Sequence, residues 1–219
     1  MIREEAGQPM ADQTPEHLSV NRTRAQGHRL PLTPAQTAGP YLRLGLSRPG
    51  MADAVAPDST GAVRVGGLLL DGAGSPVPDG VVEVWQADAA GAFHHPDDPR
   101  GPVAAPDGFT GFARSLTEDG GRWSVVTVRP GPLPAPGGGT EAPHLDVSVF
   151  ARGMLGRVVT RIYFPQDAAV QGPGGHRDDP VLARVPAARR HTLVATAAEG
   201  GYRFDIRLQG EGETVFFDL

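Results

Sequence analysis

The sequence predicts an all-β protein: a β-sandwich of mostly antiparallel strands with very little helix and an extended proline-rich N-terminal arm. Short apolar runs are separated by turn-forming sequence such as Asp71–Pro76 and Glu118–Gly121. Apolar and charged residues alternate along Tyr202–Leu208, as on a strand with one face against a core. The 219 residues include 30 glycines and 22 prolines, clustered between the apolar runs, which favours many turns joining short strands.

The N-terminal part of the chain differs in character from the rest. Residues 1–29 are polar and aperiodic, so we expect a disordered tail there and a single domain over residues 30–219. The domain begins with residues 30–42, whose three prolines forbid a regular helix and disfavour a central strand. We therefore expect an extended arm held by contacts with another surface.

Nine strands are expected after the arm, each a short apolar or alternating run bounded by turn signals. Only Asp179–Val185 has helical features, with Asp179 as the N-cap and Pro180 at the first helical position. The expected strands are Val63–Leu70, Val81–Gln86, Phe112–Leu116, Trp123–Val128, His144–Ala151, Val158–Phe164, Thr192–Thr196, Tyr202–Leu208 and Val215–Phe217.

Composition excludes several classes of function. The formal net charge is -5 and no basic block is present, which argues against a nucleic-acid partner. The chain has no cysteine, so disulfides, thiol nucleophiles and thiolate metal sites are ruled out. No apolar run reaches the length of a membrane span, and the N-terminus has no apolar stretch typical of a secretory signal. We expect a soluble cytoplasmic protein.

The strand around His144 carries the pattern closest to a metal site. Residues two apart on a strand point the same way, so His144 and Asp146 share a face. They could hold a stray divalent metal ion, or they could form a hydrogen-bonded histidine–aspartate pair. The adjacent His94 and His95 point apart on an extended chain and are a poor chelating pair.

Six segments together resemble the intradiol ring-cleaving dioxygenases. The similarity runs from about residue 30 to the C-terminus, and within the family it is closest to the alpha subunits of the two-subunit members that act on protocatechuate. The segments are Thr33–Tyr41, Val82–Asp88, Gly111–Arg114, Ala142–His144, Phe150–Gly153 and Gly201–Leu219.

The resemblance also shows where this chain departs from the family. Members hold non-haem Fe(III), a hard ion suited to phenolate and imidazole ligands, with tyrosines and histidines. The histidine pair aligns with His144 and Asp146, one tyrosine position with Leu133, and a family arginine with Glu141. The second tyrosine position falls near Asp97–Pro102, which contains none. We therefore expect no catalytic residue and no metal in this chain.

The resemblance implies a role shared with another chain. Fe(III) would be bound by a homologous beta subunit, protocatechuate and O2 would meet at the shared interface, and a higher-order oligomer is expected. Thr37, Gly39, Pro40, Tyr41 and Arg152 would line the substrate pocket. Gly39 lets backbone approach a ligand closely and Pro40 lowers the cost of ordering the arm. Arg152 could bind the ring carboxylate.

Alternatives remain open at this point. The arm could be a packing segment and Arg152 an ordinary surface ion pair. A self-sufficient dioxygenase with rearranged ligands would need tyrosines near His144, and the chain has only Tyr41, Tyr163 and Tyr202. A sandwich that merely binds or transports a ligand is the non-enzymatic alternative.

Overall fold

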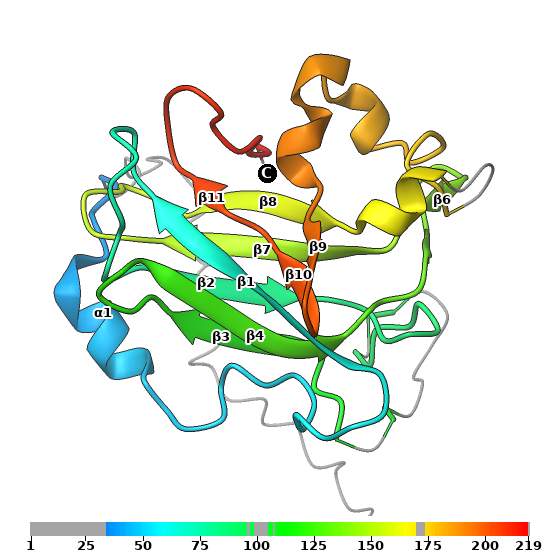
Figure 1. The fold of residues 1–219 in the computed structure, drawn as a ribbon, viewed down its shortest axis with the longest axis horizontal. Coiled ribbons are helices and arrows are strands. Elements are labelled where there is room, and N and C mark those ends of the chain that lie inside the picture. The colour runs from blue at the N-terminus through cyan, green and yellow to red at the C-terminus, as the bar shows by residue number, and fades with distance from the viewer. Residues whose placement is uncertain (1–33, 96, 99–104, 107, 170–173, 219) are drawn as a thin grey trace, which may run out of the picture. The chain divides into compact units, whose positions relative to one another are not determined.

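The computed structural model describes residues 34–95, 97–98, 105–106, 108–169 and 174–218. The expected tail, residues 1–29, and the start of the arm, residues 30–33, lie outside them. Within the unit Ala35–Leu219 two β-sheets lie one behind the other (Figure 1). The expected β-sandwich is confirmed.

The two sheets differ in the directions in which their strands pair. In the first sheet β1 pairs antiparallel with β4 and parallel with β10 and β11, and β9 pairs with β10. In the second sheet the order is β3-β2-β7-β8, with every neighbouring pair antiparallel. A short ladder joins β5 to β6. The strands are β1 (Ala62–Leu70), β2 (Val81–Trp85), β3 (Phe112–Leu116), β4 (Arg122–Val128), β5 (Leu133–Pro134), β6 (Thr140–Glu141), β7 (His144–Phe150), β8 (Val158–Tyr163), β9 (Thr196–Ala198), β10 (Gly201–Arg203) and β11 (Ile206–Arg207).

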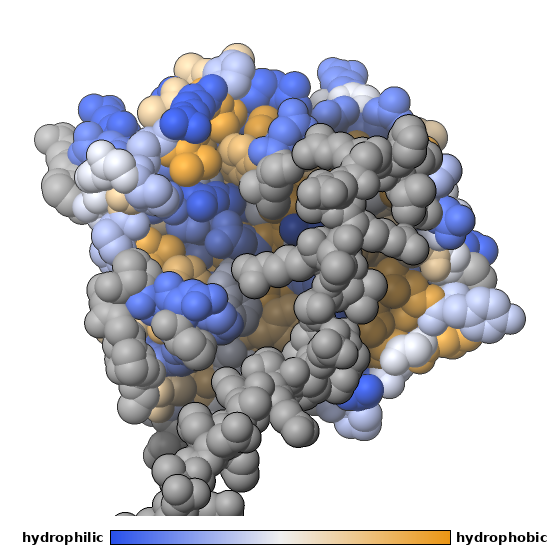
Figure 2. Space-filling model, turned by 180° about the vertical axis from the view of Figure 1, so that it is seen from behind, coloured by the Kyte–Doolittle hydropathy of each residue, from blue (hydrophilic) through white to orange (hydrophobic). Residues whose placement is uncertain are grey.

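The core lies between the two sheets and follows the period-2 pattern of the sequence. Val65 and Val125 of the first sheet and Val84 and Val147 of the second are buried in one cluster. Side chains that alternate with them point outward, as expected for sheets with one face on a core. Seen from behind, the described surface carries separate hydrophobic areas among hydrophilic ones (Figure 2).

Six expected strands are confirmed within one residue at each end, and the C-terminal ones need correction. Tyr202–Leu208 alternates as expected, but the strand is divided into β10 and β11. The division falls at Asp205, whose Oδ1 accepts a hydrogen bond from the Leu68 backbone N–H at 2.9 Å. A side chain therefore takes the place of a backbone partner, and the ladder is interrupted there.

Two other expected strands are absent as strands from the described residues. Thr192 and Leu193 belong to the 3-10 helix η4 (Ala187–Leu193), and β9 starts only at Thr196. A short apolar run fits a buried helical turn as well as a strand, so periodicity could not decide. Val215–Phe217 makes a single bridge, in which the Phe217 N–H donates to the Val159 carbonyl at 2.8 Å.

The end of the arm is helical, which the sequence analysis did not predict. Helix α1 (Gly39–Leu46) begins inside the segment 30–42 that was expected to be extended throughout, whereas the described residues 34–38 are irregular. Pro40 falls in the first helical turn, where its missing N–H breaks no hydrogen bond. Gly39 has φ +65°, a conformation that other residues rarely adopt. Of the described part of the arm, residues 34–38 are therefore irregular, and Pro40 does not prevent the helix that begins at residue 39.

The remaining helical segments are short. They are the 3-10 helices η2 (Pro165–Ala169) and η3 (Leu182–Arg184), besides η4. Asp179 caps the turn before η3 as expected, because its Oδ1 accepts the backbone N–H groups of Val181 at 2.9 Å and Leu182 at 2.7 Å. Among the described residues, none of the helices combines the length and apolarity that crossing a membrane requires.

We predict that Gly67→Ala weakens the fold at the junction of β10 and β11. A Cβ at residue 67 would lie 2.0 Å from the Phe204 carbonyl oxygen, so strand β1 or residue 204 would have to shift. The expected loss in unfolding free energy is about 3 kcal/mol, the upper part of the range for overpacking, measured by urea denaturation. Gly45→Ala is the matched control, since nothing lies within 4 Å of its Cβ position; an equal loss there would contradict the prediction.

Candidate functional site

Strand β7 carries residues of interest at both ends. His144 and Asp146 stand at its beginning, and Arg152 follows its last residue, Phe150. The strand pairs with β2 on one side and β8 on the other, so both ends are fixed by two ladders. The two ends differ in what they can do chemically.

At the beginning of β7, an arginine lies between two carboxylates. Asp146 stands directly opposite Arg161 of β8. Arg161 Nε donates to Asp146 Oδ1 at 3.0 Å, and its Nη1 donates to Glu141 Oε2 at 2.8 Å. The histidine is less closely engaged, with Nε2 at 3.6 Å from Glu141 Oε2 and 3.7 Å from Asp146 Oδ1. Its Nδ1 lies 2.7 Å from the Ala142 carbonyl oxygen. The sequence pairs His144 with Asp146, whereas the structure pairs Asp146 with Arg161.

These residues do not fit a ferric ion. Burial lowers the pKa of the Arg161 guanidinium, but Asp146, Tyr163 and Glu141 together raise it above its ordinary value, so the side chain is a permanent cation. A metal cation would compete with it for the same carboxylates. Leu133 lines the same cavity of about 270 Å³ and offers no ligand atom. In the part of the chain that the structure describes, no group of three or more metal-binding side chains is assembled.

The tyrosines do not supply the missing ligands. Burial, together with the Asp179 carboxylate, raises the pKa of Tyr163, which keeps it a neutral phenol whose O–H donates to Asp179 Oδ1 at 3.3 Å. Tyr202 accepts a hydrogen bond from Gln166 Nε2 at 2.6 Å. Tyr41 lies on α1 with 81% of its surface exposed. The arrangement therefore disfavours a self-sufficient dioxygenase with rearranged ligands.

At the other end of β7, the arm meets the loop that carries Arg152. The Gly153 backbone N–H donates to Thr37 Oγ1 at 2.9 Å. A hollow of about 210 Å³ between the two segments is lined by Gln36 and Ala38 on one side and by Phe150 and Met154 on the other. We call residues 35–46 together with residues 151–157 the arm–loop surface. Thr37 and Arg152, 115 positions apart in the sequence, thus both lie on the arm–loop surface.

Arg152 itself forms an ion pair with Asp79 through its Nε. The arginine side chain is 59% exposed and the aspartate 18%. In this structure Arg152 therefore forms the surface ion pair that was one of the two expected alternatives. A salt bridge at the surface contributes only about 0–1 kcal/mol. The exposed guanidinium can therefore still bind a second anion.

The arm is anchored a second time through α1. Arg43 Nη2 donates to the Thr117 carbonyl oxygen at 3.2 Å, which ties the helix to the end of β3. Gly39 and Tyr41 stand in the first turn of this helix, as does Pro40. The structure thus gathers the predicted pocket residues on two adjoining segments, and their contact with a substrate stays a prediction.

Large hydrophobic side chains are exposed mainly on the arm–loop surface. Of the four on the described residues, Tyr41 at 81%, Leu44 at 64% and Leu155 at 65% lie there, and Trp85 of β2 is the fourth. Sequence reasoning missed Leu44 and Leu155, because the helix that exposes Leu44 was not expected. Exposed apolar side chains on adjoining segments are typical of a surface that another protein covers.

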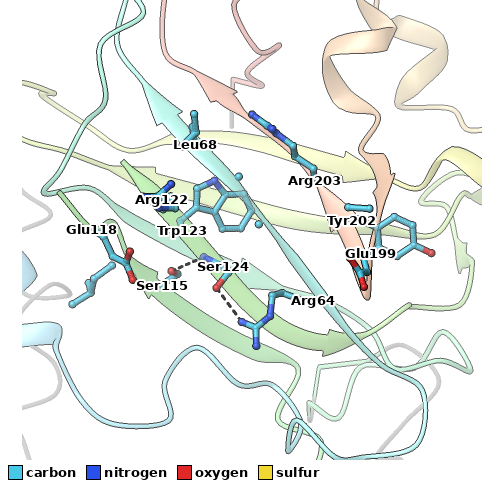
Figure 3. A pocket seen from close by; sticks show the side chains of 14 residues that line it. Arg64, Leu68, Ser115, Glu118, Arg122, Trp123, Ser124, Glu199, Tyr202 and Arg203 are labelled. Carbon is cyan, nitrogen blue, oxygen red and sulfur yellow. Dashed lines mark hydrogen bonds between the residues drawn. The ribbon is translucent and has the colours of Figure 1, made fainter. Parts of the chain in front are cut away.

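A wider groove lies on the first sheet. It has a volume of about 470 Å³ and is lined by Arg64, Arg122 and Arg203 together with Glu118 and Glu199 (Figure 3). Two of the arginines have partners in the chain, since Arg64 Nη1 donates to Ser124 Oγ at 3.2 Å and Arg203 pairs with Asp205 at 2.8 Å. None of the predicted pocket residues lines it, and we assign it no chemistry.

Comparison with known proteins agrees with the resemblance noted in the sequence. Residues 51–210 match the family model described as Dioxygenase. The chain is 38% identical over 207 residues to the protocatechuate 3,4-dioxygenase alpha chain of Pseudomonas putida, covering 87% of this chain and 98% of that one. It is 42% identical over 207 residues to the alpha chain from Burkholderia cepacia, covering 85% and 97%.

Two further comparisons are more distant. The beta chain of the Burkholderia cepacia enzyme is 36% identical over 163 residues, which cover 69% of this chain and 66% of that one. Among solved structures, the dioxygenase domain of a carbohydrate-binding fusion protein from Streptomyces sp. SirexAA-E aligns with a TM-score of 0.52 and 24% identity, covering 81% of this chain and 98% of that chain. At that identity the likeness supports the fold alone.

We predict that Arg161→Met destabilises the chain by about 3 kcal/mol. The substitution keeps a long apolar side chain but leaves Glu141 and Asp146 without their shared cation, which is costly for partly buried carboxylates. Thermal or urea unfolding of the isolated chain measures the change. Arg203→Met is the matched control, because it removes an arginine from a surface pair; equal losses for the two variants would refute the special role of Arg161.

Proposed function

Because the chain belongs to the intradiol ring-cleaving dioxygenase family, we propose that it is the alpha subunit of a hetero-oligomeric protocatechuate 3,4-dioxygenase of the cytoplasm. The complex opens the catechol ring of protocatechuate between its two hydroxyl-bearing carbons and inserts both atoms of O2. The product is 3-carboxy-cis,cis-muconate, within the breakdown of aromatic compounds. This chain forms one wall of the pocket, and a homologous beta subunit forms the other.

The observation that carries this proposal is the arm–loop surface. It combines exposed apolar side chains, Tyr41, Leu44 and Leu155, with an exposed guanidinium, Arg152. The apolar side chains favour a protein partner, since burying them in an interface removes apolar surface from water. The guanidinium favours an anionic ligand. A pocket for an anionic aromatic acid at a subunit interface needs both properties in one place.

The metal belongs to the partner in this proposal. Fe(III), when bound, activates the deprotonated catechol toward O2. By the resemblance, Asp146 and Leu133 stand where the family has metal ligands; in this chain Arg161 pairs with Asp146 and Glu141, and Leu133 offers no ligand atom. The chemistry of the donor set therefore supports an iron-bearing beta subunit and an alpha subunit without catalytic residues.

The residues of this chain bind and orient. Arg152 donates hydrogen bonds to the ring carboxylate, which places the catechol oxygens toward the partner's metal. Gly39, whose Cβ position has no atom within 4 Å, leaves room for the ring beside the first turn of α1. Thr37 fixes the distance between arm and loop through its bond to Gly153. Tyr41 and Pro40 complete the wall.

We predict that assembly depends on the exposed apolar side chains. The double variant Leu44→Ser, Leu155→Ser is expected to weaken binding of a co-expressed beta subunit by about tenfold or more, since each buried leucine contributes about 1.5–3 kcal/mol. Titration of labelled alpha chain with beta chain measures the affinity. Unfolding of the isolated variant serves as control and should be unchanged, because both side chains are exposed. Unchanged affinity would place the interface elsewhere.

We predict further that Arg152→Ala impairs binding of protocatechuate in the assembled enzyme. KM for protocatechuate should rise about tenfold or more, the value of a hydrogen bond to a charged group. KM for catechol, which lacks the ring carboxylate, should stay the same. Arg203→Ala is the control, because Arg203 is also 59% exposed and paired with an aspartate but lies outside the arm–loop surface. An equal effect of both variants would argue against a substrate contact by Arg152.

A further inference from the structure

Asp79 lies opposite Arg152 because of the register between β2 and β7. In that antiparallel ladder Val81 pairs with Phe150. Counting two residues beyond the ladder on each side, into the adjoining turns, brings residue 79 opposite residue 152. Their side chains form an ion pair in the structure. Asp79 lies in the turn just before β2 and Arg152 in the turn just after β7, so the end of the ladder brings these two oppositely charged side chains close together.

The aspartate is the fixed member of the pair. Its side chain is 18% exposed, against 59% for Arg152. The next residue, Gly80, is held on both sides by Thr117: its N–H donates to Thr117 Oγ1 at 2.7 Å, and its carbonyl accepts the Thr117 N–H at 2.9 Å. The turn that carries Asp79 is therefore rigid, whereas Arg152 has a long side chain reaching into solvent.

The contact leaves part of the guanidinium open. The closest approach to Asp79 is made by Arg152 Nε, and neither terminal nitrogen of Arg152 donates a hydrogen bond to another described residue. A guanidinium can hold one carboxylate at Nε and a second at its two terminal nitrogens, since its donors form a planar fork. The open edge has the geometry for bidentate recognition of a carboxylate.

We propose that Asp79 is the positioning residue of Arg152: it holds the guanidinium by Nε so that the two terminal nitrogens receive the ring carboxylate of the substrate. This inference rests on the proposed function, in which Arg152 binds that carboxylate. Asp79 itself touches no substrate. Its effect is to fix an exposed side chain before the substrate arrives, which lowers the entropy lost on binding.

The proposal predicts a selective effect on substrate recognition. In the assembled enzyme, Asp79→Ala should raise KM for protocatechuate about fivefold, the equivalent of about 1 kcal/mol for a facing charge pair. KM for catechol should remain unchanged, because a substrate without a ring carboxylate does not use Arg152. Asp79→Asn keeps an oxygen facing Nε but loses the charge, so its KM for protocatechuate should lie between those of the wild type and Asp79→Ala.

A double-variant cycle separates positioning from a merely structural role. If Asp79 acts through Arg152, then Asp79→Ala combined with Arg152→Ala is no worse than Arg152→Ala alone. Additive losses, or an equal rise of KM for catechol, would overturn the inference. If Asp79→Ala does not assemble, Asp79→Leu, which keeps a side chain branched at Cγ but carries no charge and no acceptor, is measured in the same cycle.

The contact between Arg152 and substrate and the positioning role of Asp79 can be refuted separately. A normal KM for protocatechuate in Arg152→Ala would refute the contact between Arg152 and substrate, and the positioning role of Asp79 would fall with it. A raised KM in Arg152→Ala together with a normal or lowered KM in Asp79→Ala would overturn only the role of Asp79. The proposed alpha-subunit function would then stand.

Discussion

The two-sided register of β7 is the constraint on which the rest of the structure depends. The strand pairs with β2 and β8 over most of its length, and a slip of one residue would turn its buried face outward. The same register sets Asp146 opposite Arg161 at one end and brings residue 79 opposite residue 152 at the other. The core thus fixes the Asp146–Arg161 pair directly, whereas Asp79 and Arg152 meet in the turns just beyond the end of the β2–β7 ladder.

The two ends of the strand have opposite chemical character. At the beginning, the positive charge belongs to the chain itself, since Arg161 lies between Glu141 and Asp146 in a partly buried setting. Carboxylates already neutralised by an arginine are poor ligands for a metal ion. At the far end, Arg152 is exposed and only partly engaged, so it can still bind an external anion.

Sequence reasoning located most strands because their residues alternate or form short apolar runs between turns. It failed where local pattern and tertiary contact disagree. Thr192 and Leu193 belong to a 3-10 helix although their composition suits a strand, and Asp205 interrupts a strand through a side-chain bond to Leu68. Helix α1 was not predicted because three prolines lie within residues 30–42. Pro40, however, stands in the first helical turn, which tolerates proline.

The sequence by itself determined the fold class and the family, because these depend on which residues are present and in what order. It also named Thr37, Gly39, Pro40, Tyr41 and Arg152 as one group. Only the tertiary structure decided which charged side chains pair. Arg161 donates a hydrogen bond to Asp146, which the sequence had paired with His144, and Arg152 forms an ion pair with Asp79. Such pairings depend on strand register and on distances between residues far apart in the chain, which no local pattern specifies.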